Sequence, residues 1–269
     1  MLKHATKIRI LSILLVFILC IPQSFPNIKL YANADTTTTP TEEVVEPSNT
    51  PATSSPELVT PEVTSSAAAT SVPESNATAD LRMIFTTDVH GNLTTTDYET
   101  GTSNATGTLA RCSTLIKQAR AEKPSGNTFL FDVGDQLYDY STDYIYEHNS
   151  ASVQPIYLAM KAMGYDAITL GNHEFDYNLA YIQNQISNSG LQDICVVSNV
   201  TYNTTKKNVW KKNMMLTRTV TLSDGSTTDI RIGIIGETQP GLSRRRTNYK
   251  NTLLTESIVE NTKKEAQEL

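Results

Sequence analysis

The sequence predicts an α/β fold, because short apolar runs with β propensity alternate with segments of helical periodicity along most of the chain. The first of these runs are Leu81 to Thr87, Thr128 to Val133 and Ala167 to Leu170, and a polar cluster directly follows each of them. Polar loops at the ends of neighbouring strands are how α/β folds build a site. Residues 80–269 are one domain's worth of chain, long enough for a core of its own.

A helix and a loop connect the first runs. The segment from about Thr108 to Glu122 carries an apolar stripe at helical spacing, which predicts a helix. The stripe consists of Leu109, Cys112, Leu115, Ile116 and Ala119. Pro124-Ser125-Gly126 ends this helix before the second strand begins. The polar, Tyr-rich segment Tyr138 to Ser150 is interpreted as a loop that lines a substrate entrance, with His148 in solvent.

Two further pairs of helix and strand follow, and each helix ends at a glycine. They are the helices from about Val153 to Met163 and from about Leu179 to Ser187, and the strands Ala167 to Leu170 and Ile194 to Ser198. Asp224-Gly225 between the segments Met215 to Leu222 and Thr228 to Ile235 predicts a β-hairpin. The last segment, Thr255 to Leu269, has helical composition. The pattern is therefore α/β with some antiparallel strands.

Residues 1–34 are interpreted as a signal peptide. The chain starts with basic residues, and the apolar run Ile10 to Ile21 is about a dozen residues long, too short to span a bilayer comfortably. Ala32-Asn33-Ala34 offers a cleavage site that would leave Asp35 as the mature N-terminus. We therefore expect export and no stable membrane span after signal removal. An uncleaved N-terminal anchor is the alternative.

Residues 35–79 are rich in Thr, Pro and Ser and hold almost no aromatic residue. Such a segment buries too little apolar surface to offset the entropy of ordering, so we expect a disordered linker. It acts either as a stalk, which is compatible with association with a cell wall, or as a plain connection. The protein is expected to be secreted or held at the cell surface.

Composition argues against a protein that binds nucleic-acid polymers and against a disulfide-rich protein. The net charge is −6 and the pI about 5.3, and the largest basic run is Arg244-Arg245-Arg246, so binding of a nucleic-acid polymer is not expected. The arginine run is interpreted as a solvated loop. The two cysteines outside the signal peptide, Cys112 and Cys195, lie in apolar patterns and are expected to be buried rather than to form a disulfide framework.

The polar clusters contain metal-ligand residue types. Side chains alternate along an extended chain, so Asp88 and His90 are expected to point the same way and to grip one metal ion. Asp135 follows a glycine at the next strand end, and its two oxygens can bridge two metals, while Asn172 offers an amide oxygen to the second. Oxygen and imidazole ligands together suit Mn, Zn or Fe. Two such ions form a clamp that activates water for in-line attack at phosphorus.

His173 follows Asn172 and is expected to project beside the metals rather than onto them. Asp176 can accept the other imidazole N–H and so fix the tautomer, which makes the two residues a candidate catalytic pair. Each cluster alone also has a structural explanation, since Gly-Asp is common in turns and Asn caps helices. Their shared placement at strand ends favours a site.

At these residues the chain resembles the calcineurin-like metallophosphoesterases, whose pattern is D-x-H, then G-D, then G-N-H-E/D, followed by two histidine motifs. The stretch Gly171 to Tyr177 is similar to the bacterial 5′-nucleotidase branch, which includes 2′,3′-cyclic-nucleotide phosphodiesterases and UDP-sugar hydrolases. The resemblance covers about Leu81 to Leu269. It implies a four-layer α/β/β/α sandwich. It also implies one metal on Asp88, His90 and Asp135, a second on Asp135 and Asn172, and His173 with Asp176 as the catalytic pair.

His173 is the last histidine of the chain, whereas the family pattern places further histidines downstream. We therefore expect residues 80–269 to be the N-terminal portion of the domain, with the sandwich incomplete at its C-terminus. The expected function is that of an exported, metal-dependent phosphoesterase acting on nucleotides or other small phosphate esters, of the 5′-nucleotidase or 2′,3′-cyclic-nucleotide phosphodiesterase type. The alternative is a truncated surface protein that is inactive or binds metal weakly.

Overall fold

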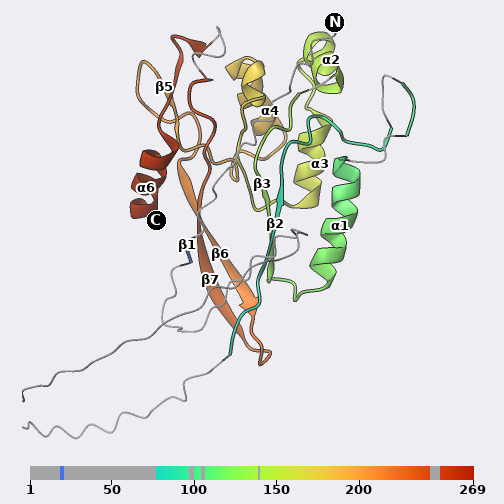
Figure 1. Cartoon of the computed structure of the whole chain (residues 1–269), viewed down its shortest axis with the longest axis vertical. Coiled ribbons are helices and arrows are strands. Elements are labelled where there is room, and N and C mark those ends of the chain that lie inside the picture. The colour runs from blue at the N-terminus through green and yellow to red at the C-terminus, as the bar shows by residue number, and fades with distance from the viewer. Residues whose placement is uncertain (1–18, 21–76, 97–99, 104–106, 139, 243–248) are drawn as a thin grey trace, which may run out of the picture. The chain divides into compact units, whose positions relative to one another are not determined.

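The computed structural model describes residues 19–20, 77–96, 100–103, 107–138, 140–242 and 249–269 (Figure 1). The expected signal peptide and linker therefore fall outside the described residues, except for residues 19–20 and 77–79, and so does the arginine run 244–246. None of the described helices is long and apolar enough to cross a membrane.

A parallel sheet forms the centre of the domain. Its strands lie in the order β2 (Arg82–Thr86), β3 (Thr128–Asp132), β4 (Ala167–Ile168), and Cys195 adds a parallel bridge beside Ile168. Every residue of β3 is buried, as expected for a central strand with both faces covered. All three strands therefore end at the same edge of the sheet.

Helices α1 (Leu109–Ala121), α3 (Pro155–Met163) and α4 (Leu179–Asn188) cover one face of this sheet (Figure 1). Their apolar faces form one core with the sheet, and its members include Ile116, Leu130, Met160, Ile168 and Ile182. Thr108 and Asn178 cap two of the helices by accepting backbone N–H groups, at 3.4 and 2.8 Å. Gly164 ends α3 in the left-handed conformation that glycine tolerates.

A second, antiparallel sheet packs on the other face. Strands β6 (Asn213–Thr221) and β7 (Thr227–Ile235) form the expected hairpin, and β1 (Leu19–Cys20) pairs with β7. Ile230, Ile232 and Ile234 of β7 share a core with Phe129 and Phe131 of β3. Helix α6 (Ile258–Glu268) contacts β7 from the outer side. The layers are thus α/β/β/α, which confirms the predicted fold class.

Two polar side chains join the sheets. Asn127, just before β3, donates from Nδ2 to the carbonyls of Thr221 (2.8 Å) and Asp80 (3.1 Å) and accepts the Thr221 N–H at 2.8 Å. Arg218 of β6 donates to the Thr128 carbonyl at 3.0 Å. It also forms an ion pair with Asp166 and lies 4.7 Å above the Phe129 ring.

The structure corrects the interpretation of Tyr138 to Ser150 as a loop, because this segment contains helix α2 (Tyr140–Asn149). The helix has a weak apolar stripe, so its sequence is uninformative, and tertiary contacts decide its conformation. The Tyr146 ring packs edge-on against Tyr177 (5.0 Å) and Tyr181 (4.7 Å). His148 is exposed as expected, and its ring stacks on Tyr144 at 4.3 Å.

Smaller differences concern the chain after residue 190. Of the expected strand Ile194 to Ser198, only Cys195 and Val196 make isolated bridges. The short strands β5 (Val200–Tyr202) and β8 (Leu253–Thr255) form an unexpected two-stranded sheet. The last helix begins at Ile258 rather than near Thr255, because Thr255 pairs with Val200. Cys195 is buried, Cys112 is partly buried, and both are unpaired.

Candidate metal centre and active site

The loops that follow β2, β3 and β4 meet at one edge of the parallel sheet. The loop after β2 is joined to the loop after β3 by three backbone hydrogen bonds. They run from Asp88 N to Gly134 O (3.0 Å), from His90 N to Asp135 O (3.1 Å) and from Gly91 N to Gln136 O (2.8 Å). The parallel sheet thus brings together clusters that are far apart in sequence.

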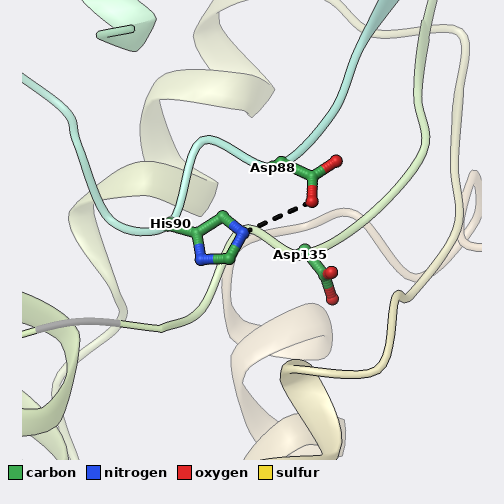
Figure 2. A group of neighbouring side chains, drawn as sticks. All are labelled: Asp88, His90 and Asp135. Carbon is green, nitrogen blue, oxygen red and sulfur yellow. Dashed lines mark hydrogen bonds and ion pairs between the residues drawn. The ribbon is translucent and has the colours of Figure 1, made fainter. Parts of the chain in front are cut away.

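Asp88, His90 and Asp135 form one group of side chains, in which one ligand atom from each lies within 4.8 Å of the others (Figure 2). His90 Nε2 and Asp88 Oδ1 are 3.4 Å apart. The chain is not extended at Asp88 and His90, so the reason for expecting their side chains to point the same way is wrong. Both residues, and Asp135, adopt left-handed conformations with φ of 53°, 51° and 57°. Such strained conformations gather at functional sites.

Two glycines allow the second and third loops to touch. A Cβ on Gly134 would lie 2.1 Å from the backbone nitrogen of Gly171, and a Cβ on Gly171 would lie 2.2 Å from Asp135 Oδ1. Gly134 also has a φ of 94°, which other residues rarely adopt. Both positions therefore require glycine, and the close approach places the chain around Asn172 against the Asp135 carboxylate.

Glu174, which opens the short helix η1 (Glu174–Asp176), binds these two loops together. Its side chain is fully buried and accepts four backbone N–H groups. They come from Gly171 (2.8 Å), Asp135 (3.0 Å), Gln136 (2.6 Å) and Leu137 (3.0 Å). Burial, and next the charge of Asp135, raise the pKa of Glu174 to about 7. The sequence interpretation gave Glu174 no role, although it stands at the acidic position of the G-N-H-E/D pattern.

A second buried acid, Asp132, lies at the end of β3. It accepts hydrogen bonds from Thr86 Oγ1 (2.5 Å), Gly134 N (3.0 Å) and Gln136 Nε2 (2.8 Å). Burial raises the pKa of this carboxyl well above its usual value. Asp132 was also missed, and its place in an apolar strand is the only signal that the sequence offers.

His173 is held at two points. Its backbone N–H donates to Asp135 Oδ1 at 2.7 Å, and its Nδ1 lies 2.7 Å from Asp176 Oδ2. The structure therefore brings the expected pair of His173 and Asp176 together. The hydrogen bond to Asp135 connects this pair to the candidate metal group. Asn172 is half-buried and lies between Gly171 and His173, whose N–H groups are both fixed.

Tyr138, the first residue of the segment expected to line a substrate entrance, forms a wall beside His90 and His173. Its ring centroid lies 4.1 Å from that of His173 and 5.2 Å from that of His90, and the two histidine rings are 5.1 Å apart. Tyr138 is 46% exposed, so part of it remains accessible to solvent. By contrast, Tyr144 and Tyr146 of the same segment contact His148 and Tyr177.

The donor set fits a divalent first-row metal ion. Carboxylate oxygens and imidazole nitrogen suit Mn, Zn or Fe, and the separation of their atoms allows one ion to contact all three side chains. The close contacts at Gly134 and Gly171 fix the backbone of the loop that carries Asp135. Such a group beside a paired histidine can bind and hydrolyse a phosphate ester.

Comparisons with known proteins agree with this chemistry. The profile of the family described as calcineurin-like phosphoesterase matches residues 81–246. The chain is 32% identical over 196 residues to a 2′,3′-cyclic-nucleotide 2′-phosphodiesterase/3′-nucleotidase of Haemophilus influenzae, which covers 71% of this chain and 29% of the relative. It is 30% identical over 188 residues to the trifunctional nucleotide phosphoesterase protein YfkN of Bacillus subtilis, which covers 67% of this chain and 12% of the relative. The chain thus spans less than a third of the length of these curated relatives.

Solved structures are similar as well. The calcineurin-like phosphoesterase YfkN from Bacillus subtilis matches with a TM-score of 0.62 and 28% identity, over 70% of this chain and 58% of that chain. A putative 5′-nucleotidase from Staphylococcus aureus matches with a TM-score of 0.54 and 24% identity, over 69% of this chain and 34% of that chain, and shows likeness of fold alone.

Proposed function

This chain belongs to the calcineurin-like phosphoesterase family, and on that premise we propose that it is the metal-binding part of an exported phosphoesterase that hydrolyses nucleotides. The activity would be of the 5′-nucleotidase or 2′,3′-cyclic-nucleotide phosphodiesterase type, in keeping with the names of its relatives. The observation that carries the proposal is the convergence of Asp88, His90 and Asp135 within 4.8 Å, beside the pair of His173 and Asp176.

Two divalent ions, of Mn, Zn or Fe, are the proposed cofactors. Asp88, His90 and Asp135 would hold the first, and Asp135 with Asn172 would contribute to the second. When bound, such ions lower the pKa of a water and neutralise charge on the phosphoryl oxygens. The backbone bonds of Glu174 keep the Asp135 loop in place, so the carboxylate needs no rearrangement to bind.

His173 is the proposed acid or hydrogen-bond donor toward the substrate. Its Nδ1 is engaged with Asp176, so Nε2 is the nitrogen that can donate to a phosphoryl oxygen or to the leaving alkoxide. The Asp176 carboxylate accepts a hydrogen bond from the Nδ1–H group and fixes the ring orientation. The Tyr138 ring, which lies tilted against the His173 ring, limits rotation of the imidazole and narrows the site.

Export is proposed from the sequence. The basic start, the short apolar run and the Ala32-Asn33-Ala34 motif are the marks of a signal peptide. Sequencing the N-terminus of the protein from the culture medium or the cell surface tests this, and Asp35 is the expected first residue. A mature protein that begins at Met1 would contradict cleavage.

The activity is tested with the full protein by phosphate release from nucleoside monophosphates and by ring opening of 2′,3′-cyclic nucleotides to nucleoside monophosphates. Activity should require Mn²⁺, disappear with EDTA and be abolished by Asn172→Ala. Asn184→Ala, at an exposed position of α4, is the matched control and should keep full activity. Activity that persists without metal would overturn the proposal, and metal binding without phosphate release would favour a metal-binding surface protein.

A further inference from the structure

Asp132, the last residue of β3, is hydrogen-bonded to the ends of all three strands of the parallel sheet. Its carboxyl accepts from Thr86 Oγ1 at the end of β2 (2.5 Å) and from the N–H of Gly134 after β3 (3.0 Å). Its backbone carbonyl accepts the N–H of Thr169, which follows β4, at 3.0 Å. The three loops that carry the candidate ligands therefore all begin at groups bonded to this one residue.

The Asp132 carboxyl is bonded on both sides of the candidate ligand Asp135. Its Oδ1 accepts the N–H of Gly134, and its Oδ2 accepts from Gln136 Nε2 at 2.8 Å. An aspartate that accepts the N–H two residues ahead forms a turn of its own. Here the turn contains Gly134, with a φ of 94°, and leads into Asp135, with a φ of 57°. The carboxyl thus supports the left-handed backbone from which the Asp135 side chain projects.

Thr86 connects the same carboxyl to the first ligand loop. Its hydroxyl lies between Asp132 Oδ2 (2.5 Å) and the Tyr165 hydroxyl (2.8 Å). Asp88 follows two residues later and donates its backbone N–H to the Gly134 carbonyl at 3.0 Å. The first and second ligand loops therefore leave the sheet from one connected set of hydrogen bonds.

These polar side chains cannot contact a substrate directly. Thr86, Asp132, Gln136 and Tyr165 are all buried, and none of them belongs to the group of candidate metal ligands. Burial of a carboxyl costs free energy, and an apolar residue at the end of the apolar strand β3 would avoid this cost. A buried acid that no ligand reaches can act only through the backbone that it holds.

We propose that Asp132, together with Thr86, is a positioning residue for the candidate metal centre. It fixes the backbone of the first two ligand loops so that the donor atoms of Asp88, His90 and Asp135 converge. The inference rests on the proposed function and deepens it, because it adds a residue that acts through the ligands. The role differs from that of Glu174, which joins the second ligand loop to the third.

The test is calorimetric titration of Mn²⁺ into the full protein without substrate. Asp132→Asn keeps the shape of the side chain but replaces one acceptor oxygen by an NH₂ group. It should weaken Mn²⁺ binding by about 10–100-fold, as the loss of a partner behind a metal ligand does. Thr86→Val, which removes only the hydroxyl, should weaken binding by about tenfold, and Thr86→Ser should restore the wild-type affinity.

Two controls separate positioning from stability. Thr128→Val makes the same replacement at the start of β3, where the hydroxyl has no hydrogen-bond partner among the described residues. Val220→Ala removes apolar volume from the core that β7 shares with β3. Both variants should keep the wild-type affinity for Mn²⁺. The inference is wrong if Asp132→Asn binds Mn²⁺ like the wild type, or if Val220→Ala loses as much affinity.

Hydrogen exchange gives a second readout that needs no metal. In the presence of EDTA, the Gly134 N–H should exchange with deuterium about tenfold faster in Asp132→Asn than in the wild type. Equal exchange in the two proteins would overturn the inference. Mn²⁺ binding without phosphate release would contradict the proposed function alone, and the affinities of the variants would still decide the inference. If Asp132→Asn does not fold by circular dichroism, the comparison of Thr86→Val with Thr86→Ser decides it by Mn²⁺ affinity.

Discussion

The carboxylate of Glu174 lies 3.0 Å from the backbone N–H of Asp135, so a buried acid fixes the loop of the central candidate ligand. At pH 8, above its pKa of about 7, this carboxylate is ionised and accepts all four N–H groups. Glu174→Gln should then destabilise the protein by about 2–3 kcal/mol, the worth of hydrogen bonds to a charged group, and weaken Mn²⁺ binding. Urea unfolding and calorimetry measure the two effects. Glu260→Gln, at an exposed position of α6, should change neither.

Asp176→Asn should lower kcat by about 10–100-fold with little change in metal affinity, because the amide holds the His173 ring less well. His173→Ala should lower kcat by about 100–10,000-fold. The double variant should be no slower than His173→Ala, since paired groups act as a unit. Steady-state hydrolysis of adenosine monophosphate checks this, with exposed Asp193→Asn as the control. A wild-type kcat for Asp176→Asn would remove the pair from the mechanism.

Replacement of Tyr138 separates its ring from its hydroxyl. The contacts to His173 and His90 are made by the ring, so Tyr138→Phe should keep kcat, whereas Tyr138→Ala should lower it by about tenfold through loss of orientation. Tyr144→Ala, whose ring stacks on His148 instead, is the comparison and should keep kcat. Equal kcat values for the Phe and Ala variants would show that the wall has no role in catalysis.

Glu237 makes stability depend on pH. It is buried, accepts from Asn261 Nδ2 at 2.7 Å and from Thr262 Oγ1 at 3.2 Å, and burial raises its pKa from the usual 4.5 to about 7. The unfolded chain loses this proton first, so the contribution of Glu237 to stability is full below pH 4.5 and is lost as the pH rises through 7, by up to about 3 kcal/mol. Glu237→Gln should reduce this fall between pH 5 and pH 8 in urea titrations. Glu174 and Asp132 act in the same direction in both proteins, so the difference isolates Glu237, and identical slopes would contradict the assignment.

The sheet and most helices could be predicted from the sequence because burial leaves a strong local pattern. Strand β3 lies within an apolar run, and the helices α1, α3 and α4 have caps or breakers at their ends. Helix α2 could not be predicted, since Tyr146 is positioned by rings more than thirty residues away in the chain. The strands β5 and β8 pair residues that lie more than fifty positions apart, and they are too short to leave a pattern.

The candidate site could likewise be predicted only in part. The residue types and their place at strand ends were visible in the sequence, and the structure brings Asp88, His90 and Asp135 together. Their left-handed backbone was not visible, because nothing local to an aspartate or a histidine demands it. The ring contacts of Tyr138 with the two histidines could not be predicted either, because they join loops that follow different strands.

The amide of Asn127 has a consequence for how the domain opens. This amide bonds to the N–H and the carbonyl of Thr221 in β6 and also to the carbonyl of Asp80. It therefore connects the hairpin to the parallel sheet. The hairpin cannot detach without exposing this buried amide together with the Phe129 side of the core. The slowest amide protons of β3, β6 and β7 should therefore exchange with deuterium in a single cooperative event rather than sheet by sheet.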